Sequence, residues 1–415
     1  MKSKHFDVSV RLNVLIVFAI FGAACTGPPL TTVLVDLAYP NVEGSGEPHL
    51  AVAPTGEVIL SWLEPTPQGH SLKFAAFSGE VWSTANTVET GADLMANWAD
   101  FPSVVPISGD LWAAHWLVFQ ADNPFGYDAM ASLSRDAGKH WGAPFLLHRD
   151  MTPTEHGFVS FLPRGSGLGV VWLDGRNMIV NGEPAFVGAG GKPLGMSLRY
   201  AQFSAGGDRQ FSGVVDDLVC DCCQTDVAVT GNSLVLAYRD RTADDIRDIV
   251  VRRLEDGKWT ARVQVGPDGW FFPGCPINGP AIAADGEEVV VAWFAAPNDD
   301  PKVRLARSSN GGRTFLDPVS VDTAGSFGHV DVALLEDGDA AVSWVRRDGQ
   351  SRVALSVRLI SVDGVLGDIY TVSTLNTARP LDFPQMVSNG RSLIFAWTGV
   401  DVAEGIKTAR LELAR

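Results

Sequence analysis

The chain has 415 residues and a formal charge of −16, and it combines 46% hydrophobic residues with only 19% charged residues. A disordered chain shows few apolar residues and a high charge, so this composition predicts a folded protein. The 43 Gly and 24 Pro indicate frequent turns, while 12 Trp and 21 Phe can fill a large core. The net negative charge argues against nucleic acid as a partner, because phosphate binding requires a basic face.

The N-terminal segment predicts a targeting signal. Three Lys or Arg residues precede or adjoin an apolar run over Leu12–Phe21, which is too short to span a bilayer. The small residues before Cys25 resemble a bacterial lipobox, in which the Cys is lipidated and becomes the new N-terminus. We therefore expect residues 1–24 to be a signal peptide and 25–30 a lipid-anchored tether, with plain secretion as the alternative. The implied location is the bacterial cell envelope, periplasmic or at the surface, with the lipid as the only membrane contact.

A repeated pattern fills the rest of the chain. After an apolar strand at Thr31–Leu37, each repeat has one apolar strand, a Gly turn and a second strand that ends in an aromatic residue. These aromatic residues are Trp62, Trp116, Trp172, Tyr238, Trp293, Trp344 and Trp397, spaced 54, 56, 66, 55, 51 and 53 residues apart. A period near 50 with about four short strands per unit is typical of propeller blades.

We therefore predict one all-β domain over residues 31–415, a β-propeller of four-stranded blades. Seven blades follow from the seven repeats, and six are the alternative if the third repeat, with the longest spacing, is irregular. The last repeat offers only three strands before the end of the sequence. We expect the strand at Thr31–Leu37 to complete that blade and close the ring, because closure removes the sheet edges. No segment predicts a helix.

Two turns in phase with the repeats share one sequence pattern. Their residues are Ser134, Asp136, Gly138 and Trp141 in the first turn, and Ser308, Asn310, Gly312 and Phe315 in the second. The Asp or Asn side chain can cap the turn, Gly takes the positive φ, and the aromatic ring packs back on the blade. The pattern resembles the Asp box of sialidases and related BNR-repeat propellers, and this resemblance implies the same fold for the whole mature chain.

The resemblance also implies where a sialidase site would lie. In that family an Arg-Ile-Pro motif supplies one of three Arg that bind the substrate carboxylate, a Tyr–Glu pair supplies the nucleophile and an Asp the acid/base. Here Gly46, Glu47 and Pro48 stand in place of the motif, so the first Arg is absent and Glu47 would repel a carboxylate. Tyr238 is a candidate nucleophile, with a core aromatic as the alternative.

The cysteines form a second local pattern. Cys220, Cys222 and Cys223 precede the fourth repeat and Cys275 precedes the fifth, so both segments are loops between blades. Such loops of neighbouring blades lie side by side, and an oxidising envelope favours disulfides. Of the three pairings possible, we favour Cys275 with Cys222 or Cys223, because this link closes the longer loop. No cofactor is required, and a thiolate site for copper or zinc is the alternative.

Charged and aromatic residues gather in loops expected on the same face. Arginine binds anionic groups in a bidentate manner, and Trp rings can stack on sugars. The candidate ligand-binding residues are Trp98, Arg176, Arg239, Arg241, Arg247, Trp270, Asp299 and Arg346. The candidate catalytic residues are Asp100, Asp174, Tyr238, Asp240 and Arg241. A solvated network of ion pairs is the alternative for these loops.

The segments CDCCQTDVA, YRDR followed by IRDI, and GCPINGPA resemble a group of bacterial sialidase-like envelope proteins. The sequence thus predicts an envelope lipoprotein that binds a glycan or protein partner at the Cys/Arg/Asp face. Two alternatives stay open: a glycoside hydrolase of the sialidase type with a rearranged site, which needs two carboxyl groups about 5–9.5 Å apart, and a copper or zinc thiolate protein.

Overall fold

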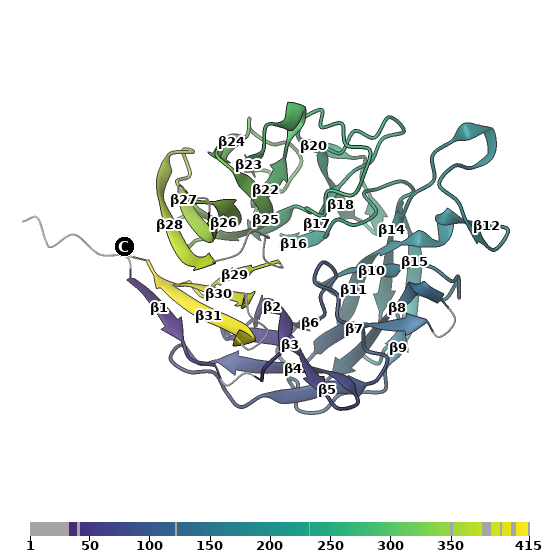
Figure 1. Ribbon diagram of the computed structural model, residues 1–415, viewed down its shortest axis with the longest axis horizontal. Coiled ribbons are helices and arrows are strands. Elements are labelled where there is room, and N and C mark those ends of the chain that lie inside the picture. The colour runs from purple at the N-terminus through teal and green to yellow at the C-terminus, as the bar shows by residue number, and fades with distance from the viewer. Residues whose placement is uncertain are drawn as a thin grey trace, which may run out of the picture.

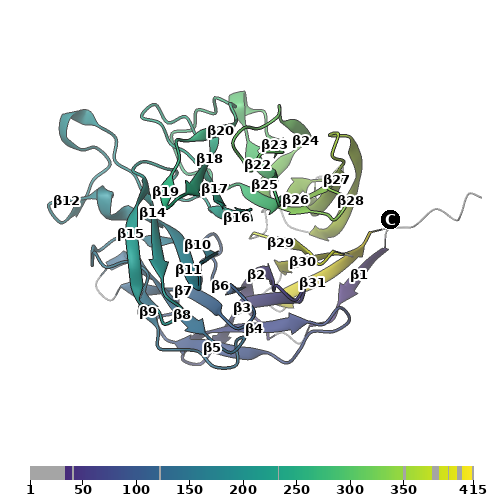
Figure 2. The ribbon, with the colours of Figure 1, turned by 180° about the vertical axis from the view of Figure 1, so that it is seen from behind.

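The protein is an all-β propeller with seven blades, as the repeats predicted. The computed structural model describes residues 33–39, 42–120, 123–231, 233–348, 352–375, 383–390, 392–399 and 404–413. The predicted signal peptide, Cys25 and the predicted tether lie outside these residues. Figures 1 and 2 show antiparallel sheets arranged as a ring around a central axis. No helix in the part that is described is long and apolar enough to cross a bilayer.

Each blade runs outward from the axis through consecutive strands. Blade 1 contains β2 (Gly46–Val52), β3 (Val58–Thr66), β4 (Gly69–Phe77) and β5 (Asn86–Gly91). Blade 2 contains β6 (Ser103–Pro106), β7 (Trp112–Gln120), β8 (Asn123–Ser134) and β9 (Phe145–Leu146). Blade 3 contains β10 (His156–Arg164), β11 (Gly167–Asp174), β14 (Ser197–Phe203) and β15 (Arg209–Asp216).

The remaining blades follow the same order. Blade 4 contains β16 (Asp226–Thr230), β17 (Ser233–Arg239) and β18 (Ile249–Glu255), with β19 (Lys258–Trp259) and β20 (Val263–Gly266) both paired to β18. Blade 5 contains β21 (Ala281–Asp285), β22 (Glu288–Ala295), β23 (Lys302–Ser308) and β24 (Val319–Asp322). Blade 6 contains β25 (Ser326–Leu334), β26 (Ala340–Arg347), β27 (Val353–Ile360) and β28 (Leu366–Leu375).

Blade 7 joins the two ends of the chain. It contains β29 (Gln385–Ser388), β30 (Ser392–Thr398), β31 (Ile406–Glu412) and, as its outer strand, β1 (Val33–Leu37). β1 pairs antiparallel to β31, with Val35 opposite Arg410, and Figure 1 shows the purple first strand beside the yellow last one. The predicted closure of the ring is therefore confirmed, because the first strand of the described chain completes the blade that the last three strands form.

An insertion in blade 3 explains the irregular spacing of the third repeat. Between β11 and β14 the chain forms a 3-10 turn, the hairpin of β12 (Ile179–Val180) and β13 (Glu183–Pro184), and a second 3-10 turn. This segment extends outward from the ring (Figure 1), so it lengthens the repeat without changing the number of blades.

The recurring aromatic residues fill the space between blades. All seven have exposed fractions of 5% or less. Three of them also donate a hydrogen bond to an Asp at the end of the preceding blade: Tyr238 to Asp216 (2.7 Å), Trp293 to Asp268 (2.7 Å) and Trp344 to Asp322 (2.8 Å). A buried N–H or O–H needs such a partner, and here the partner links one blade to the next.

The two turns with the repeated pattern join third to fourth strands. In the first, Ser134 Oγ accepts the N–H of Gly138 at 2.9 Å and Asp136 accepts that of His140 at 2.9 Å. In the second turn, Ser308 and Asn310 accept the equivalent N–H groups of Gly312 and Thr314, at 2.9 and 3.0 Å. Both Gly have a φ near +80°, a conformation that glycine adopts without strain. Trp141 and Phe315 pack partly buried against the blade.

Candidate functional site

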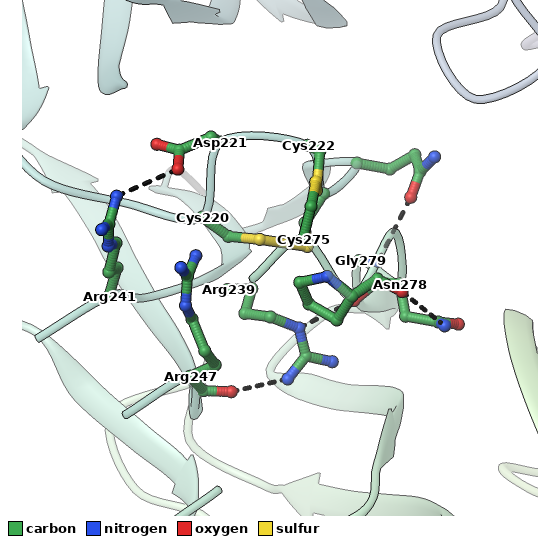
Figure 3. The surroundings of a disulfide bond; sticks show 12 residues. Cys220, Asp221, Cys222, Arg239, Arg241, Arg247, Cys275, Asn278 and Gly279 are labelled. Carbon is green, nitrogen blue, oxygen red and sulfur yellow. Dashed lines mark hydrogen bonds and ion pairs between the residues drawn. A yellow bond between two sulfur atoms is a disulfide. The ribbon is translucent and has the colours of Figure 1, made fainter. Parts of the chain in front are cut away.

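The cysteines lie in two loops between blades and are bonded in pairs. One disulfide joins Cys220 to Cys223, and the other joins Cys222 to Cys275 across blades 4 and 5, with Cα atoms 5.7 and 6.0 Å apart (Figure 3). The link between blades that the sequence favoured is therefore present. With all four sulfurs bonded, none is a thiolate in this state, so a copper or zinc site at these residues stays a proposal for the reduced protein.

Two of the predicted ligand-binding residues lie beneath this face rather than on it. Arg239, with an exposed fraction of 1%, donates hydrogen bonds to the backbone carbonyls of Asn278 (2.8 Å), Arg247 (2.6 Å) and Phe294 (2.6 Å). Its guanidinium also lies 4.9 Å from the centre of the buried Trp270 ring. Burial lowers the pKa of Arg239 to about 9. Arg239 and Trp270 therefore support the loops and do not reach a ligand.

Two further arginines form a network with carboxylates next to the disulfides. Arg241 contacts Asp221 at 3.0 Å and Asp245 at 2.9 Å, and Arg247 contacts the same oxygen of Asp245 at 3.3 Å. Asp221 also accepts the backbone N–H of Met196 at 2.8 Å. Figure 3 shows Asp221 facing Arg241 beside the cysteines. The charges of this network largely cancel, so it does not offer a free pair of guanidiniums to an anion.

A pocket of about 290 Å³ lies next to this network, and we call it the mouth pocket. It is lined by Met95, Asn97, Trp98, Ala99, Phe119, Gly126, Tyr127, Glu155, Phe158, Cys222 and Ile277. Trp98 is 44% exposed and its ring stacks against Phe383, with centroids 6.1 Å apart. Burial and the nearby charge of Asp221 raise the pKa of Glu155. The pocket thus combines an exposed aromatic face, a carboxyl group and the disulfide between the blades.

A buried carboxyl group lies behind the mouth pocket. Asp100 accepts the backbone N–H of Phe158 at 2.7 Å and lines the central cavity of about 640 Å³ that the inner strands enclose. Burial raises the pKa of Asp100 to about 7 and raises that of neighbouring Tyr127 well above its usual value. Ala99 and Phe158 line both spaces, so the pocket and the cavity adjoin each other.

Asp174 and Arg176 belong to a different cluster, between blades 2 and 3. Arg176 binds the Asp174 carboxylate through two nitrogens, both at 2.6 Å, and Asp150 at 2.8 Å. Asp174 is fully buried and also accepts the indole N–H of Trp172 at 2.8 Å. Neither residue lines the mouth pocket, so the predicted grouping of Asp174 and Arg176 with the cysteine face does not form.

The other candidates are spread over blades 4 to 6. Tyr238 is buried with its hydroxyl on Asp216, while Asp240 receives two hydrogen bonds from Arg262 at 2.9 Å each. Arg346 lies 3.4 Å from Asp322. Asp299 is exposed at the end of a 3-10 turn. The structure therefore brings Trp98, Cys222 and the Arg241 network together at one place. Tyr238, Asp240, Asp299 and Arg346 lie apart from it.

Comparisons with known proteins support the fold and leave the activity open. No known protein-family profile matches the chain, and no curated protein matches it. Among solved structures, a protein of unknown function from Dyadobacter fermentans is 14% identical, with a TM-score of 0.50, over 93% of this chain and all of that chain. At this identity the likeness concerns the fold alone.

Sialidase structures are also among the matches. The endosialidase of phage phi92 is 10% identical with a TM-score of 0.48, over 94% of this chain and 72% of that chain. A sialidase from Streptococcus pneumoniae is 11% identical with a TM-score of 0.44, over 93% and 71% of the two chains.

Proposed function

We propose that this protein is a cell-envelope propeller that binds a neutral glycan in the mouth pocket. The observation that carries the proposal is the pairing of an exposed Trp98 ring with the Glu155 carboxyl group in one small pocket. An aromatic ring offers an apolar surface to the C–H face of a sugar, and a carboxylate accepts hydrogen bonds from two hydroxyl groups. Small-molecule sites typically combine an apolar wall with a few placed polar groups in this way.

The charges around the pocket favour a neutral ligand over sialic acid. Arg241 and Arg247 face carboxylates, and Arg239 faces carbonyl groups in the interior. Glu155 itself would repel a carboxylate when ionised. At the position where the sialidase resemblance places the first Arg, Gly46 is buried, with the Thr398 methyl group 3.6 Å from where a Cβ would lie.

A glycan fits the size of the pocket better than a protein partner does. A stable protein–protein interface buries about 800 Å² on each side, whereas this pocket suits a small ligand. A glycan array with neutral and sialylated sugars tests the choice. We expect binding to neutral glycans, and a preference for sialylated ones would contradict the proposal.

The attachment to the membrane is part of the same proposal. The short apolar run before Cys25 supports a lipid anchor that holds the propeller at the envelope surface. Changing Cys25→Ser should release the protein into the soluble fraction. If the variant still sediments with membranes as the parent protein does, the anchor is not at Cys25.

One observation favours a second candidate function, glycoside hydrolysis. A carboxyl group with a pKa of about 7, such as Asp100, could remain protonated at neutral pH and act as a general acid. Turnover of a panel of fluorogenic glycosides, abolished in Asp100→Asn, would favour the hydrolase over a binding protein.

A further inference from the structure

A cluster of His and Asp side chains lies between blades 2 and 3, outside the mouth pocket. It comprises Asp128 on β8, His148 and Asp150 in the loop before β10, and His156 at the start of β10. Both imidazole rings are buried, with exposed fractions of 1% and 0%. They stack in parallel with centroids 3.6 Å apart. Polar and charged groups in the interior are stable only when they are hydrogen-bonded or paired with an opposite charge.

The stacked rings face one carboxylate on each side. On the first side, His148 Nδ1 lies 3.0 Å from Asp150 Oδ1, and His156 Nε2 lies 3.2 Å from Asp150 Oδ2. On the second side, His148 Nε2 lies 3.2 Å from Asp128 Oδ1, and His156 Nδ1 lies 3.8 Å from the same oxygen. Each ring therefore directs one nitrogen to Asp150. The other nitrogen of His148 faces Asp128 Oδ1, whereas that of His156 lies nearer to the backbone carbonyls of Thr154 (3.2 Å) and Tyr127 (3.4 Å) than to Asp128.

We propose that Asp128 Oδ1, His148 Nε2 and His156 Nδ1 bind a divalent transition-metal ion of the zinc type. Bonds of about 2.0–2.2 Å to one ion place neighbouring ligand atoms roughly 3–4 Å apart, and the two separations from Asp128 Oδ1 lie in this range. His148 Nε2 is buried, and its 3.2 Å contact with Asp128 Oδ1 falls short of hydrogen-bond geometry. Asp128 Oδ1 itself accepts a side-chain N–H of Gln120 at 2.6 Å. Two imidazoles with one carboxylate suit zinc, iron or manganese rather than magnesium or calcium, which prefer oxygen ligands.

Asp150 orients both ligands. A histidine that binds a metal usually donates its other ring N–H to a carboxylate, which fixes the tautomer. Here one carboxylate serves both rings, because its two oxygens face His148 Nδ1 and His156 Nε2. Asp150 is in turn held by Arg176 at 2.8 Å. This arrangement leaves His148 Nε2 directed to the side of Asp128, and His156 Nδ1 joins it when its ring turns from the Thr154 and Tyr127 carbonyls, 3.2 and 3.4 Å away.

The charge of the cluster also favours a cation. Asp128, Asp150 and Asp174 supply three carboxylates, and two guanidiniums face them: Arg176, and Arg199 at 4.0 Å from Asp174. Both guanidiniums lie on the side of Asp150 and Asp174, whereas the partners of Asp128 among the described residues are Gln120 and the two imidazoles. With both imidazoles neutral, the charge of Asp128 is left without a cation beside it, which is costly in a largely buried place. A bound cation compensates it. The two rings must tilt apart on binding, because parallel lone pairs at this spacing cannot both point at one ion.

Titration of the purified, disulfide-intact mature protein with Zn²⁺ and Co²⁺, after treatment with a chelator, tests the site. We expect one ion per chain, a Co²⁺ visible spectrum typical of N and O ligands, and a higher midpoint of thermal unfolding. His148→Ala should abolish binding, and Asp150→Asn should weaken it about 10- to 100-fold. His140→Ala is the matched control, because this histidine is highly exposed on the first repeated turn, and it should bind like the parent.

Two results would overturn the proposal. One is the absence of stoichiometric binding to the folded parent protein, which would leave the cluster as a hydrogen-bonded network without a metal. The other is binding that survives His148→Ala or shows a thiolate charge-transfer band, which would locate the ion at reduced cysteines. If His148→Ala fails to fold, His148→Gln keeps the side-chain volume and the Co²⁺ spectrum of the parent still reports the ligand set.

Discussion

Gly157 and Asp100 lie in direct contact: the Asp100 carboxylate occupies the space in which a side chain at position 157 would lie. A Cβ atom there would also be 2.9 Å from the Tyr127 ring. The absent side chain lets the loop before β6 approach β10, where Asp100 accepts the N–H of Phe158. This contact connects the wall of the mouth pocket to the central cavity.

We predict that Gly157→Ala destabilises the fold by about 1–3 kcal/mol, the usual cost of overpacking a core. Gly109→Ala is the control, because no atom lies within 4 Å of its Cβ position. The midpoints of urea unfolding measure both effects. Equal stability of the two variants would show that Asp100 moves aside at no cost.

Burial raises the pKa values of three cavity-lining carboxyl groups, Asp100, Asp226 and Asp331, to about 7. Between pH ~4, where they titrate in the unfolded chain, and this value, the folded state binds more protons than the unfolded one. The contribution of these groups to the free energy of unfolding is therefore greatest below pH ~4, and it disappears as the pH rises through 7.

Asp100→Asn removes one of these groups. Each such proton contributes a slope of at most about 1.4 kcal/mol per pH unit, so the fall in stability between pH 4 and 7 should be shallower in the variant. Denaturant unfolding at several pH values measures the slope, with the exposed Asp110→Asn as control. An unchanged slope would mean that Asp100 is ionised throughout this range.

The disulfide between Cys222 and Cys275 closes a loop of 53 residues, whereas Cys220 and Cys223 are three residues apart. The chain-entropy model assigns the first about 4 kcal/mol and the second about 2 kcal/mol. Replacing Cys222 and Cys275 by Ser should therefore destabilise the protein more than replacing Cys220 and Cys223. Differential scanning calorimetry of both double variants checks the order, and the reverse order would contradict the pairing.

Tyr238→Phe separates a structural role from a catalytic one. The buried hydroxyl donates to Asp216, so its loss should cost about 1 kcal/mol of stability. Ligand binding and any glycosidase turnover should be unchanged in the folded variant. A selective loss of turnover with unchanged stability would instead assign Tyr238 to catalysis.

The sequence predicted the fold because the spacing of the repeats along the chain determines the number of blades. Seven aromatic positions, short apolar strands and the spare strand at the N-terminus specify seven blades and their closure. The inter-blade disulfide could also be predicted, since the repeats place Cys222 and Cys275 in adjacent loops. These inferences depend only on spacing along the chain.

The candidate site was predicted less well, because spacing does not tell which way a loop side chain points. Arg239 and Trp270 turn inward, whereas Trp98 turns outward. Tyr127 was missed because it lies on the third strand of a blade, where no loop signal marks it. The cluster around His148 was missed because its residues come from separate segments and match no standard metal motif.

Calorimetric titration with the best neutral glycan from the array tests the central claim most directly. The parent protein and the control Phe186→Ala, which alters an exposed aromatic residue on the blade 3 insertion, should bind with the same affinity. Trp98→Ala should abolish binding, and Glu155→Gln should weaken it about tenfold, the equivalent of 1.4 kcal/mol. Binding that is unchanged in both pocket variants would contradict a glycan site at the mouth pocket.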